Sequence, residues 1–379
     1  MKKLKVMVVL GTRPEIIRLS SVIKELEKNT NLILVHTGQN YDYELNHVFF
    51  EDLGIKKPKV FLNVSTKSAL NSIGEIISKT EACLDKHKPD AFLILGDTNS
   101  CLSAISAKKK KVPIFHMEAG NRCFDQRVPE ETNRKIVDHI SDINLPYSDI
   151  AREYLLNEGI HADRIIKTGS PMYEVVNQNL EKIMASNVLS KLKLTRRKYF
   201  LVSSHREENV DDQDKLKKLV VALNHLNRIY NLPILFSTHP RTKKMLSKLK
   251  IKLNKNIILH KPFGYFDYVN LQLNARATLS DSGTINEESS ILDFPAINIR
   301  DAHERPEGME EGAVIMTGFN SDRIIQALNI IEKQSSSGER NSILVADYSK
   351  PNVSKKVLRI IASYIDYVNS KVWSKADSL

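Results

Sequence analysis

The sequence predicts an α/β protein built from two doubly wound domains, each a parallel sheet covered by helices on both faces. Short, continuous apolar runs such as "KVMVVL" and "AFLILG" alternate with amphipathic helical stretches, as in parallel sheets whose two faces are buried. The pattern occurs twice, on either side of the helix-like stretch "NQNLEKIMASNVLSKLKL". The 379 residues also exceed what one ordinary hydrophobic core holds, which favours two domains.

Each apolar run is expected to be a strand. In the first half the runs are "KVMVVL", "NLILVH", "AFLILG", "VPIFHM" and "RIIKTG"; in the second they are "KYFLVSS", "LPILFST", "NIILH", "ATLSD" and "PAINI". We predict a first domain over residues 1–175, a second over 176–355, and a final helix over 356–379 that packs back on the first domain.

The composition is that of a globular protein, because 41% hydrophobic and 27% charged residues exclude the disordered and fibrous classes. The longest apolar runs fall far short of the roughly 20 residues that a membrane-spanning helix needs, so no membrane insertion is expected. The opening "MKKLKVMVVLGTRPE" has too short an apolar run for a signal peptide and meets Gly-Thr-Arg-Pro instead of small residues. We interpret it as a first strand and predict a cytoplasmic protein.

The net charge of +11 and the pI of 9.3 fit either a nucleic acid or an anionic small substrate. Basic residues are spread over the predicted helices, and the one block, "AKKKKVP", lies at a predicted helix C-terminus, where cations offset the helix dipole. No aromatic side chains alternate with this block, and no RNP-like motif appears. An anionic small molecule is therefore the expected partner, and nucleic acid is not.

The cysteines and the carboxylates do not form a recognisable metal or disulfide pattern. Cys83, Cys101 and Cys123 are scattered without CxxC spacing. Cys123 is most simply a bystander thiol, because spacing fixes no base beside it. Metal binding by Asp97 with His116 and Glu118 is conceivable, but these residues lack HExxH or facial-triad spacing, so no metal is expected.

In doubly wound sheets ligands bind beyond the carboxyl ends of the strands, and the residues that follow the predicted strands are unusually polar. In the first half these residues are "GTRPE" (11–15), "GDTNS" (96–100) and "HMEAG" (116–120). In the second half they are "SSHREE" (203–208), "THPR" (238–241) and "DSGT" (281–284). The chemistry is expected in these loops.

Two of the loops have the geometry of anion sites. "GTRPE" combines a glycine for a tight turn with Pro14 in the first helical turn and Arg13 beside a helix N-terminus, and "DSGTINEE" places free backbone N–H groups at Ser282 and Gly283. Ordinary capped helices show the same residues, so each loop alone leaves both interpretations open. Neither loop matches GxGxxG or GxxxxGK[ST], so NAD and P-loop nucleotides lack support.

The stretch "HMEAGNRCFDQRVPEETNR" (116–134) sets acidic residues among arginines. The topology brings Asp97, Glu118 and Glu130 to one sheet edge, where carboxylates raise one another's pKa and can act as base and acid near neutral pH. A surface ion-pair network made by the same residues is the alternative.

Two histidines follow predicted strands. His205, with Arg206 next to it, either contacts a ligand or is structural. The same two roles are open to His239 in "STHPRT", where the sequence supports ligand contact less strongly.

Together these motifs resemble the non-hydrolysing UDP-N-acetylglucosamine 2-epimerase family over nearly the whole chain. The matching strings are "GTRPE", "GDTNS", "EAG", "PEETNR", "HRE", "DSGTINEE" and "RPEG", in that order. The resemblance implies a GT-B-like architecture of two Rossmann-like domains, an active-site cleft with UDP between them, and a homodimer.

The reaction that the resemblance implies inverts C2 of a 2-acetamido sugar without a cofactor. No carbonyl acidifies the C2 hydrogen, so the proton is removed while the C1–O bond breaks and UDP leaves. A 2-acetamidoglycal remains, and UDP adds back as a proton reaches the other face of C2. The site must supply a base and an acid on opposite ring faces, together with cations for the departing diphosphate.

Carried over motif by motif, the resemblance implies catalytic roles for Asp97, Glu118, Glu130 and His205, the last near the pyrophosphate. Arg13, Ser282 and Gly283 would hold phosphates, Glu288 the ribose hydroxyls and the backbone around Phe263 the uracil. The further substrate contacts are Arg18, Arg206 and His239. No metal is implied.

The chain departs from the common family pattern beside the sugar. Common members have "GTRPEAIK" and "EAGLRTG" where this chain has "GTRPEIIR" and "EAGNRCF", so Arg18 and Asn121 differ, and the loop between "EAG" and "PEE" is shorter here. Many bacterial members have "QH" at an effector site where this chain has Gln39 and Asn40, which leaves allosteric activation open.

Three longer strings, "HTGQNYDYELN", "GDTNSCLS" and "HMEAGNRCFDQRVPEE", resemble the branch that converts UDP-2-acetamido-2,6-dideoxy-L-talose to UDP-N-acetyl-L-fucosamine for capsule or O-antigen. They predict this substrate, and a changed loop suits a 6-deoxy L-sugar. The alternatives are UDP-N-acetylglucosamine as substrate, giving UDP-N-acetylmannosamine, a UDP-dependent GT-B glycosyltransferase, and a non-catalytic nucleotide-sugar sensor.

Overall fold

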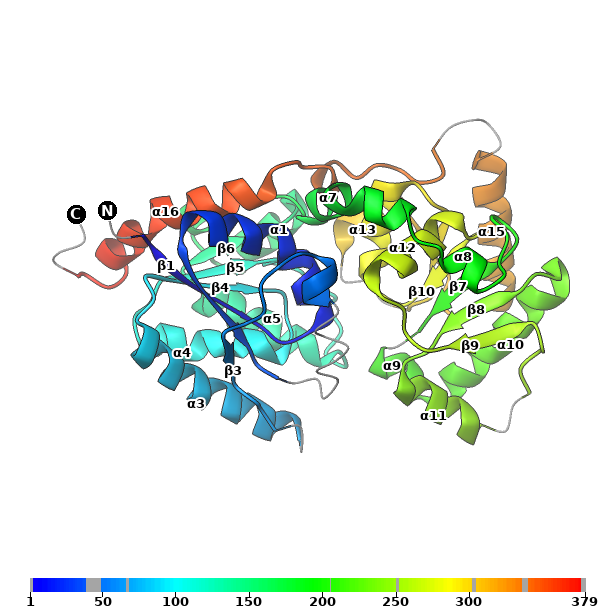
Figure 1. The fold of residues 1–379 in the computed structure, drawn as a ribbon, viewed down its shortest axis with the longest axis horizontal. Helices are drawn as coiled ribbons and strands as arrows, with labels where there is room; N and C mark the ends of the chain where they lie inside the picture. Colours follow the sequence, from blue (N-terminus) through cyan, green and yellow to red (C-terminus); the bar gives the residue numbers. More distant parts are fainter. Residues whose placement is uncertain are drawn as a thin grey trace. The chain divides into compact units, whose positions relative to one another are not determined.

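The computed structural model folds into two compact α/β units (Figure 1). It describes residues 3–38, 49–65, 68–204, 206–249, 252–301, 305–335 and 340–375. The first unit comprises Met1–Asn177 and Asp347–Leu379, and the second comprises Gln178–Ala346. The predicted α/β class with two doubly wound parallel sheets is confirmed.

The first unit is built on a parallel sheet with the strand order β3-β2-β1-β4-β5-β6. Its strands are β1 (Lys5–Leu10), β2 (Asn31–His36), β3 (Val60–Phe61), β4 (Ala91–Leu95), β5 (Ile114–Met117) and β6 (Ile143–Leu145). The central strands are continuously buried, which explains their unbroken apolar runs. The direction of winding reverses between β1 and β4, and such a switch point opens a crevice at the carboxyl ends of these two strands.

Helices cover both faces of the first sheet. They are α1 (Arg13–Asn29), α3 (Ala69–His87), α4 (Ala104–Lys109), α5 (Pro129–Ile140), α6 (Asp149–Asn157), α7 (Met172–Met184, which runs on into the second unit) and α16 (Val353–Lys371). Short 3-10 helices lie at Asn99–Ser103, Ala162–Arg164 and Ala346–Tyr348. Residues of α3, α4 and α5 share a core with one face of the sheet, while α1 and α16 pack against each other on the opposite face (Figure 1).

The second unit repeats this topology with the strand order β12-β11-β10-β7-β8-β9, also parallel. Its strands are β7 (Phe200–Ser203), β8 (Ile234–Ser237), β9 (Ile257–His260), β10 (Thr278–Ser280), β11 (Ala296–Asn298) and β12 (Ile315–Met316). Its helices are α8 (Val188–Lys191), α9 (Glu207–Val210), α10 (Gln213–Tyr230), α11 (Pro240–Lys248), α12 (Tyr265–Asn274), α13 (Thr284–Leu292), α14 (Pro306–Glu310) and α15 (Ser321–Ser335). The core under α10, α11 and α15 lies on one face, and the cores under α8, α12 and α13 lie on the other. The switch point here lies between β7 and β10.

Local side chains decide where the long helices begin and end. Ser68 caps α3 by accepting a bond from the N–H of Asn71 at 3.1 Å. Asp212 caps α10 by accepting bonds from the next N–H groups at 2.9 and 3.1 Å. Both helices end at residues in the left-handed conformation, Lys88 (φ 46) and Asn231 (φ 49). The chain therefore leaves α3 and α10 at defined residues and continues into the strands that follow, β4 and β8.

One predicted strand is wrong. "RIIKTG" forms only an isolated bridge between Ile165 and Asn144, and the edge strand is β6 instead. The run that forms β6, "INL", is three residues long, and the two-residue strands β3 and β12 were not predicted either. Edge strands this short carry too little periodicity to be recognised.

Candidate active site

Glu15, in the first turn of α1, joins the two loops at the switch point of the first sheet. One carboxylate oxygen accepts bonds from the N–H of Gly11 (3.0 Å), the N–H of Thr12 (2.8 Å) and the hydroxyl of Thr12 (2.7 Å). The other accepts a bond from the hydroxyl of Ser100, which follows β4. Burial raises the pKa of Glu15, and the bonds from Ser100 and Thr12 oppose that rise. The loop after β1 is thereby fixed to the loop after β4.

Helix α1 carries both predicted arginines of this edge. Arg13 opens the helix, with its guanidinium carbon 5.7 Å from the centroid of the Phe49 ring. Arg18 lies farther along α1, where its Nη1 donates to Oε2 of Glu118. The helix therefore presents one arginine to the switch point and uses the other to hold a carboxylate.

Glu118 is held by two donors in an unusual backbone conformation. It follows β5 with φ at 65°, in the left-handed region that non-glycine residues seldom adopt. Its Oε2 accepts a bond from Arg18 and its Oε1 one from Nδ2 of Asn121 at 3.4 Å. The side chains of Glu118 and Arg18 are 10% and 4% exposed. Two of the residues at which the chain departs from the common family pattern, Arg18 and Asn121, thus hold this carboxylate.

Asp97, after β4, is held by Arg134 of α5. Nε and Nη2 of Arg134 approach Oδ2 of Asp97 at 2.8 and 2.7 Å, and its Nη1 donates to Oε2 of Glu131 at 2.8 Å. Glu131 also accepts bonds from the N–H groups of Cys123 (3.1 Å) and Phe124 (3.3 Å). Burial opposes ionisation of Glu131, but the bonds from Arg134 and Cys123 lower its pKa overall. Glu131 thereby ties the short loop to the helix that positions Asp97.

The two glutamates of "PEE" have different surroundings. Glu131 is fully buried in the network just described, whereas Glu130 is half-buried in the first turn of α5, where the helix dipole favours a carboxylate. Asp125 and Arg127 form an exposed ion pair at 2.7 Å. The charged stretch therefore contains the ion pairs of the alternative interpretation as well as the carboxylates expected at the sheet edge.

A buried charge network lies behind Glu118. Nδ1 of His116 is 2.9 Å from Oδ1 of Asp138, and Nη1 of Arg122 donates to Oδ2 of Asp138 at 2.7 Å. Arg122 also pairs with Glu158 at 2.6 Å. Burial alone would raise the pKa of Asp138, but the contacts with His116 and Arg122 lower it. The network fixes α5 to the loop that carries the predicted catalytic glutamate.

The glycine of "EAG" is required by close packing. Gly120 has φ at 81°, and its N–H donates to Asp138 at 3.2 Å. A Cβ at this position would lie 2.3 Å from the carbonyl oxygen of Ala151. No side chain fits there, which explains the motif in physical terms.

At the second sheet, Asp281 plays the part that Glu15 plays at the first. It follows β10, and its Oδ2 accepts bonds from the hydroxyl of Ser204 (2.8 Å), the N–H of Arg206 (3.2 Å) and Nδ2 of Asn209 (3.2 Å). These three donors all follow β7. The carboxylate thus joins the loops on either side of the switch point.

The predicted nucleotide contacts of the second unit lie around this edge. Glu288, on α13, accepts a bond from Nε2 of Gln272 at 2.6 Å. The Phe263 ring stacks on His260, with centroids 4.1 Å apart. His239 caps α11, with Nδ1 accepting a bond from the N–H of Arg241 at 3.4 Å, and its contact with substrate stays a prediction.

The expectation of a free N–H at Ser282 is wrong. That N–H donates to the hydroxyl of Ser280 at 3.1 Å, because Ser280 ends β10 with its side chain beside the following turn. Gly283 precedes α13, so its place at a helix N-terminus is as predicted. His205, Gln39 and Asn40 lie outside the described residues.

Sequence reasoning missed the residues that hold the others. Glu15, Glu131, Asp138 and Asp281 are buried carboxylates that join loops or orient arginines, and none was predicted as a site residue. Of these residues, Glu15 could have been found from the sequence, because Thr12 and Glu15 form a capping box. For Asp138 and Asp281 the partners are distant in sequence, so no local pattern identifies them.

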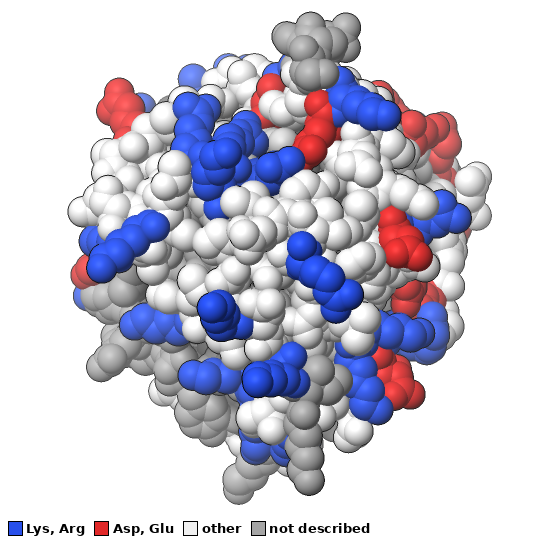
Figure 2. Space-filling model, turned by 90° about the vertical axis from the view of Figure 1, so that its right-hand side faces the viewer, with Lys and Arg blue, Asp and Glu red and all other residues white. Residues whose placement is uncertain are grey.

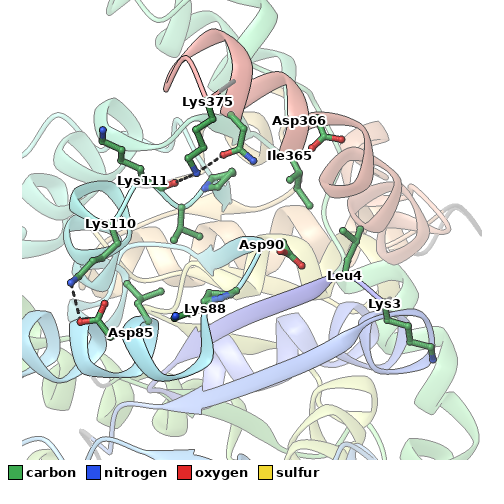
Figure 3. Close-up of a pocket in the computed structure, with 15 residues that line it drawn as sticks. Lys3, Leu4, Asp85, Lys88, Asp90, Lys110, Lys111, Ile365, Asp366 and Lys375 are labelled. Carbon is green, nitrogen blue, oxygen red and sulfur yellow. Dashed lines mark hydrogen bonds and ion pairs between the residues drawn. The ribbon is translucent and has the colours of Figure 1, made fainter. Parts of the chain in front are cut away.

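A pocket of about 890 Å³ lies at the opposite edge of the first sheet, beside the residues that precede β1, β4 and β5 (Figure 3). Its lysines bind groups at helix ends: Nζ of Lys375 donates to the carbonyl of Lys111 at 2.8 Å, and Lys110 pairs with Asp85 at 2.9 Å. Lys110 and Lys111 follow α4, which ends at Lys109, so the helix C-terminus predicted for the lysine block is confirmed. Ligands of doubly wound sheets bind at the other edge, so we do not place the chemistry here.

Among the described residues, no group of three or more His, Cys, Asp or Glu side chains could hold a metal ion. Within the same ranges, every helix is too short or too polar to cross a bilayer.

Comparison with known proteins places this geometry among UDP-sugar enzymes. Residues 24–362 match the family model for UDP-N-acetylglucosamine 2-epimerase. The structure of UDP-N-acetylglucosamine 2-epimerase from Rickettsia bellii is 53% identical, with 98% of this chain and 100% of that chain covered and a TM-score of 0.92. That of the Methanocaldococcus jannaschii enzyme in complex with UDP-GlcNAc and UDP is 37% identical, with 95% and 100% covered and a TM-score of 0.87. UDP-2,3-diacetamido-2,3-dideoxy-D-glucuronate 2-epimerase from Pseudomonas aeruginosa is 34% identical, with 86% and 91% covered.

Proposed function

Because the chain belongs to the UDP-N-acetylglucosamine 2-epimerase family and is therefore an isomerase, we propose that it inverts C2 of UDP-2-acetamido-2,6-dideoxy-L-talose to give UDP-N-acetyl-L-fucosamine. The observation that carries the reaction is the grouping at one sheet edge of Asp97 and Glu118, each held by an arginine. Glu130 lies in the first turn of α5, the helix that carries Arg134. These are the groups that a proton transfer at a sugar carbon needs.

The proposed chemistry is elimination followed by re-addition. A carboxylate takes the C2 proton, the C–H electron pair forms the C1–C2 double bond, and UDP leaves with the electrons of the C1–O bond. UDP oxygen then attacks C1 while an acid on the opposite ring face protonates C2. Two of the carboxylates Asp97, Glu118 and Glu130 serve as the base and the acid, and Arg13 and His205 stabilise the departing diphosphate.

The second unit is proposed to bind the nucleotide. Its switch-point loops, joined by Asp281, include Arg206 and Gly283, which precedes α13. A helix N-terminus offers backbone N–H groups and a favourable dipole to phosphates. Glu288 and Phe263 would contact the ribose and the uracil. The cleft between the domains, the homodimer and the role in capsule or O-antigen synthesis stay predictions.

The choice of sugar rests on Arg18 and Asn121. Common family members have lysine and leucine at these positions, and here both side chains donate to Glu118. An amide in place of an apolar side chain changes both the polarity and the hydrogen-bonding capacity beside this carboxylate, which suits a sugar of different configuration. UDP-N-acetylglucosamine is the second candidate, since the 37% identical M. jannaschii enzyme was solved in complex with it.

Proton NMR in D₂O tests both candidates. The protein is incubated with UDP-N-acetyl-L-fucosamine and with UDP-N-acetylglucosamine in separate tubes, and deuterium at C2, a new C2 epimer and free UDP are followed. Exchange with the L-fucosamine nucleotide alone is the expected result. Exchange with the glucosamine nucleotide alone would support the proposed reaction but identify UDP-N-acetylglucosamine as the substrate. If the protein binds UDP but exchanges neither nucleotide, the proposed reaction is contradicted.

A further inference from the structure

We propose that the outer face of α10 and α11 in the second unit docks on an anionic phospholipid surface. The sequence from Lys215 to Phe266, which spans α10, β8, α11 and β9, contains twelve Lys or Arg residues and no Asp or Glu. A protein of net charge +11 does not by itself concentrate charge in this way. The proposal is independent of the reaction proposed above.

The fold gathers these charges on one face. α10 and α11 share a core on the same side of the second sheet, so their polar sides point outward together. We call their exposed cations the basic face, which consists of Lys217, Lys218, Arg228, Arg241, Lys243, Lys244 and Lys248. Figure 2 shows this end of the molecule, where Lys and Arg side chains are spread with few Asp or Glu between them.

Most of the basic face has no carboxylate to neutralise it. Lys217 pairs with Asp214 at 2.9 Å, and Arg241 pairs with Asp211. Lys218 interacts electrostatically with Asp212. Within the described part of the chain, no carboxylate partner is found for the other four members of the face. Unpaired cations on one face give a positive potential that attracts anionic surfaces.

Aliphatic side chains lie among the cations. Val221 and Ile229 of α10 are 56% and 49% exposed, and Ile258 of the edge strand β9 is 43% exposed. Surfaces that combine lysines with exposed aliphatic side chains bind at the boundary between lipid headgroups and acyl chains. Cations supply the long-range attraction, and the aliphatic groups supply burial after contact.

Nucleic acid fits this face less well than lipid does. Ten of the twelve cations in the stretch are lysine, whereas base and phosphate recognition favours the planar fork of arginine. Two aromatic rings of the stretch offer no platform for stacking bases, because Tyr230 packs on Arg276 (4.6 Å) and Phe236 is buried. A lipid headgroup needs only a positive surface with apolar groups.

Vesicle binding tests the proposal with the full-length protein. The probes are phosphatidylcholine vesicles with and without phosphatidylglycerol, used in flotation at low and physiological salt. The unaltered protein is expected to bind the anionic vesicles only and to lose binding as salt rises. The variant Lys218→Gln/Lys244→Gln/Lys248→Gln is expected to bind roughly 100-fold more weakly, at about fivefold per charge removed.

A matched control removes the same charge elsewhere. Lys28→Gln/Lys86→Gln/Lys355→Gln changes three exposed lysines of the first unit and is expected to bind as the unaltered protein does. Val221→Ser/Ile229→Ser is expected to weaken the binding that survives at higher salt. Circular dichroism confirms that each variant is folded. The proposal is overturned if both triple variants lose binding equally, or if neutral vesicles bind as well as anionic ones. It is also overturned if the protein binds single-stranded RNA but no vesicles.

Discussion

The carboxyl edges of the two sheets share a strand order and differ in what they hold. Each edge uses one buried carboxylate, Glu15 or Asp281, to join the loops on either side of the switch point. At the first edge, further carboxylates are paired with arginines, as in Glu118 with Arg18. The described bonds around Asp281 come instead from a hydroxyl, a backbone N–H and an amide. The same scaffold therefore supports two kinds of site, and the loop side chains decide which.

Charge is managed differently at the two edges. The pKa of Asp138 is lowered because the contacts with His116 and Arg122 outweigh its burial. In the second unit, burial and then the nearby Glu288 raise the pKa of Tyr268, so its hydroxyl stays neutral and donates to Ser203 at 2.9 Å. The second unit also holds a buried ion pair, Arg305 with Glu287 at 3.1 Å, so the difference concerns Asp138 and Tyr268 and not every group of the two units.

The largest expected effect separates chemistry from binding. Glu118→Gln keeps the shape of the side chain but removes its charge and its capacity to accept a proton. We expect kcat to fall by about 10³-fold, within the range for loss of a general acid or base. Calorimetry should show unchanged affinity for UDP. Asp125→Asn, in the exposed pair of the same loop, should keep full turnover, and a Glu118→Gln enzyme with normal kcat would remove this residue from the mechanism.

The next effect concerns stability at the first edge. Asp138→Asn leaves His116 and Arg122 without their shared charge partner, and breaking such a buried pair costs about 3 kcal/mol. Because the folded pKa of Asp138 lies below 3.8, its stabilisation is present above that pH and is lost as pH falls through the folded value. Urea unfolding should therefore show a difference between the two proteins that shrinks at acidic pH. A difference in the free energy of unfolding that is the same at every pH would contradict a stabilising role for the ionised Asp138.

The sequence predicts the strands and loops of both edges better than the bonds within them. Apolar runs such as that of β4 locate the sheet because burial on both faces leaves a continuous pattern. Glu130 and Glu131 look alike in sequence, and only the fold shows that Glu131 is buried against Arg134. The contacts of Asp138 and Asp281 depend on strand order, which no local pattern contains.

A third prediction tests the second edge. Asp281→Ala removes the acceptor shared by Ser204, Asn209 and the N–H of Arg206, so the loop after β7 loses its tie to β10. We expect UDP affinity to fall about tenfold, which corresponds to about 1.4 kcal/mol. Asp281→Asn, which keeps one oxygen acceptor, should lose less. Calorimetry with UDP measures both, and equal affinities for all three proteins would show that this tie does not position the nucleotide loop.

A smaller effect tests the choice of sugar. Asn121→Leu restores the side chain of common family members and removes the bond from Nδ2 to Glu118. Loss of one such bond is worth about 1 kcal/mol, so kcat/KM for the L-fucosamine nucleotide should fall about fivefold. The ratio of kcat/KM for the two UDP-sugars should shift toward N-acetylglucosamine. An equal change for both sugars would assign Asn121 to general support of Glu118 and not to selectivity.

The smallest effect concerns the carboxyl that joins the first edge. Glu15→Gln can keep the pattern of bonds, because the amide oxygen accepts from Gly11 and Thr12 while the amide N–H₂ donates to the hydroxyl of Ser100. Burial raises the folded pKa of Glu15 above 4.5, so the free energy of unfolding falls as pH rises through the folded value and the buried carboxyl ionises. Glutamine does not ionise, so the variant does not lose this stability. Below pH 4.5 the two proteins should have nearly equal free energies of unfolding, and at neutral pH the variant should be the more stable. Urea titrations across this range measure the difference. A wild-type protein that gains stability relative to the variant as pH rises would mean that the donors around Glu15 outweigh its burial, and the first edge would then be organised by a buried charge at its joining residue as well.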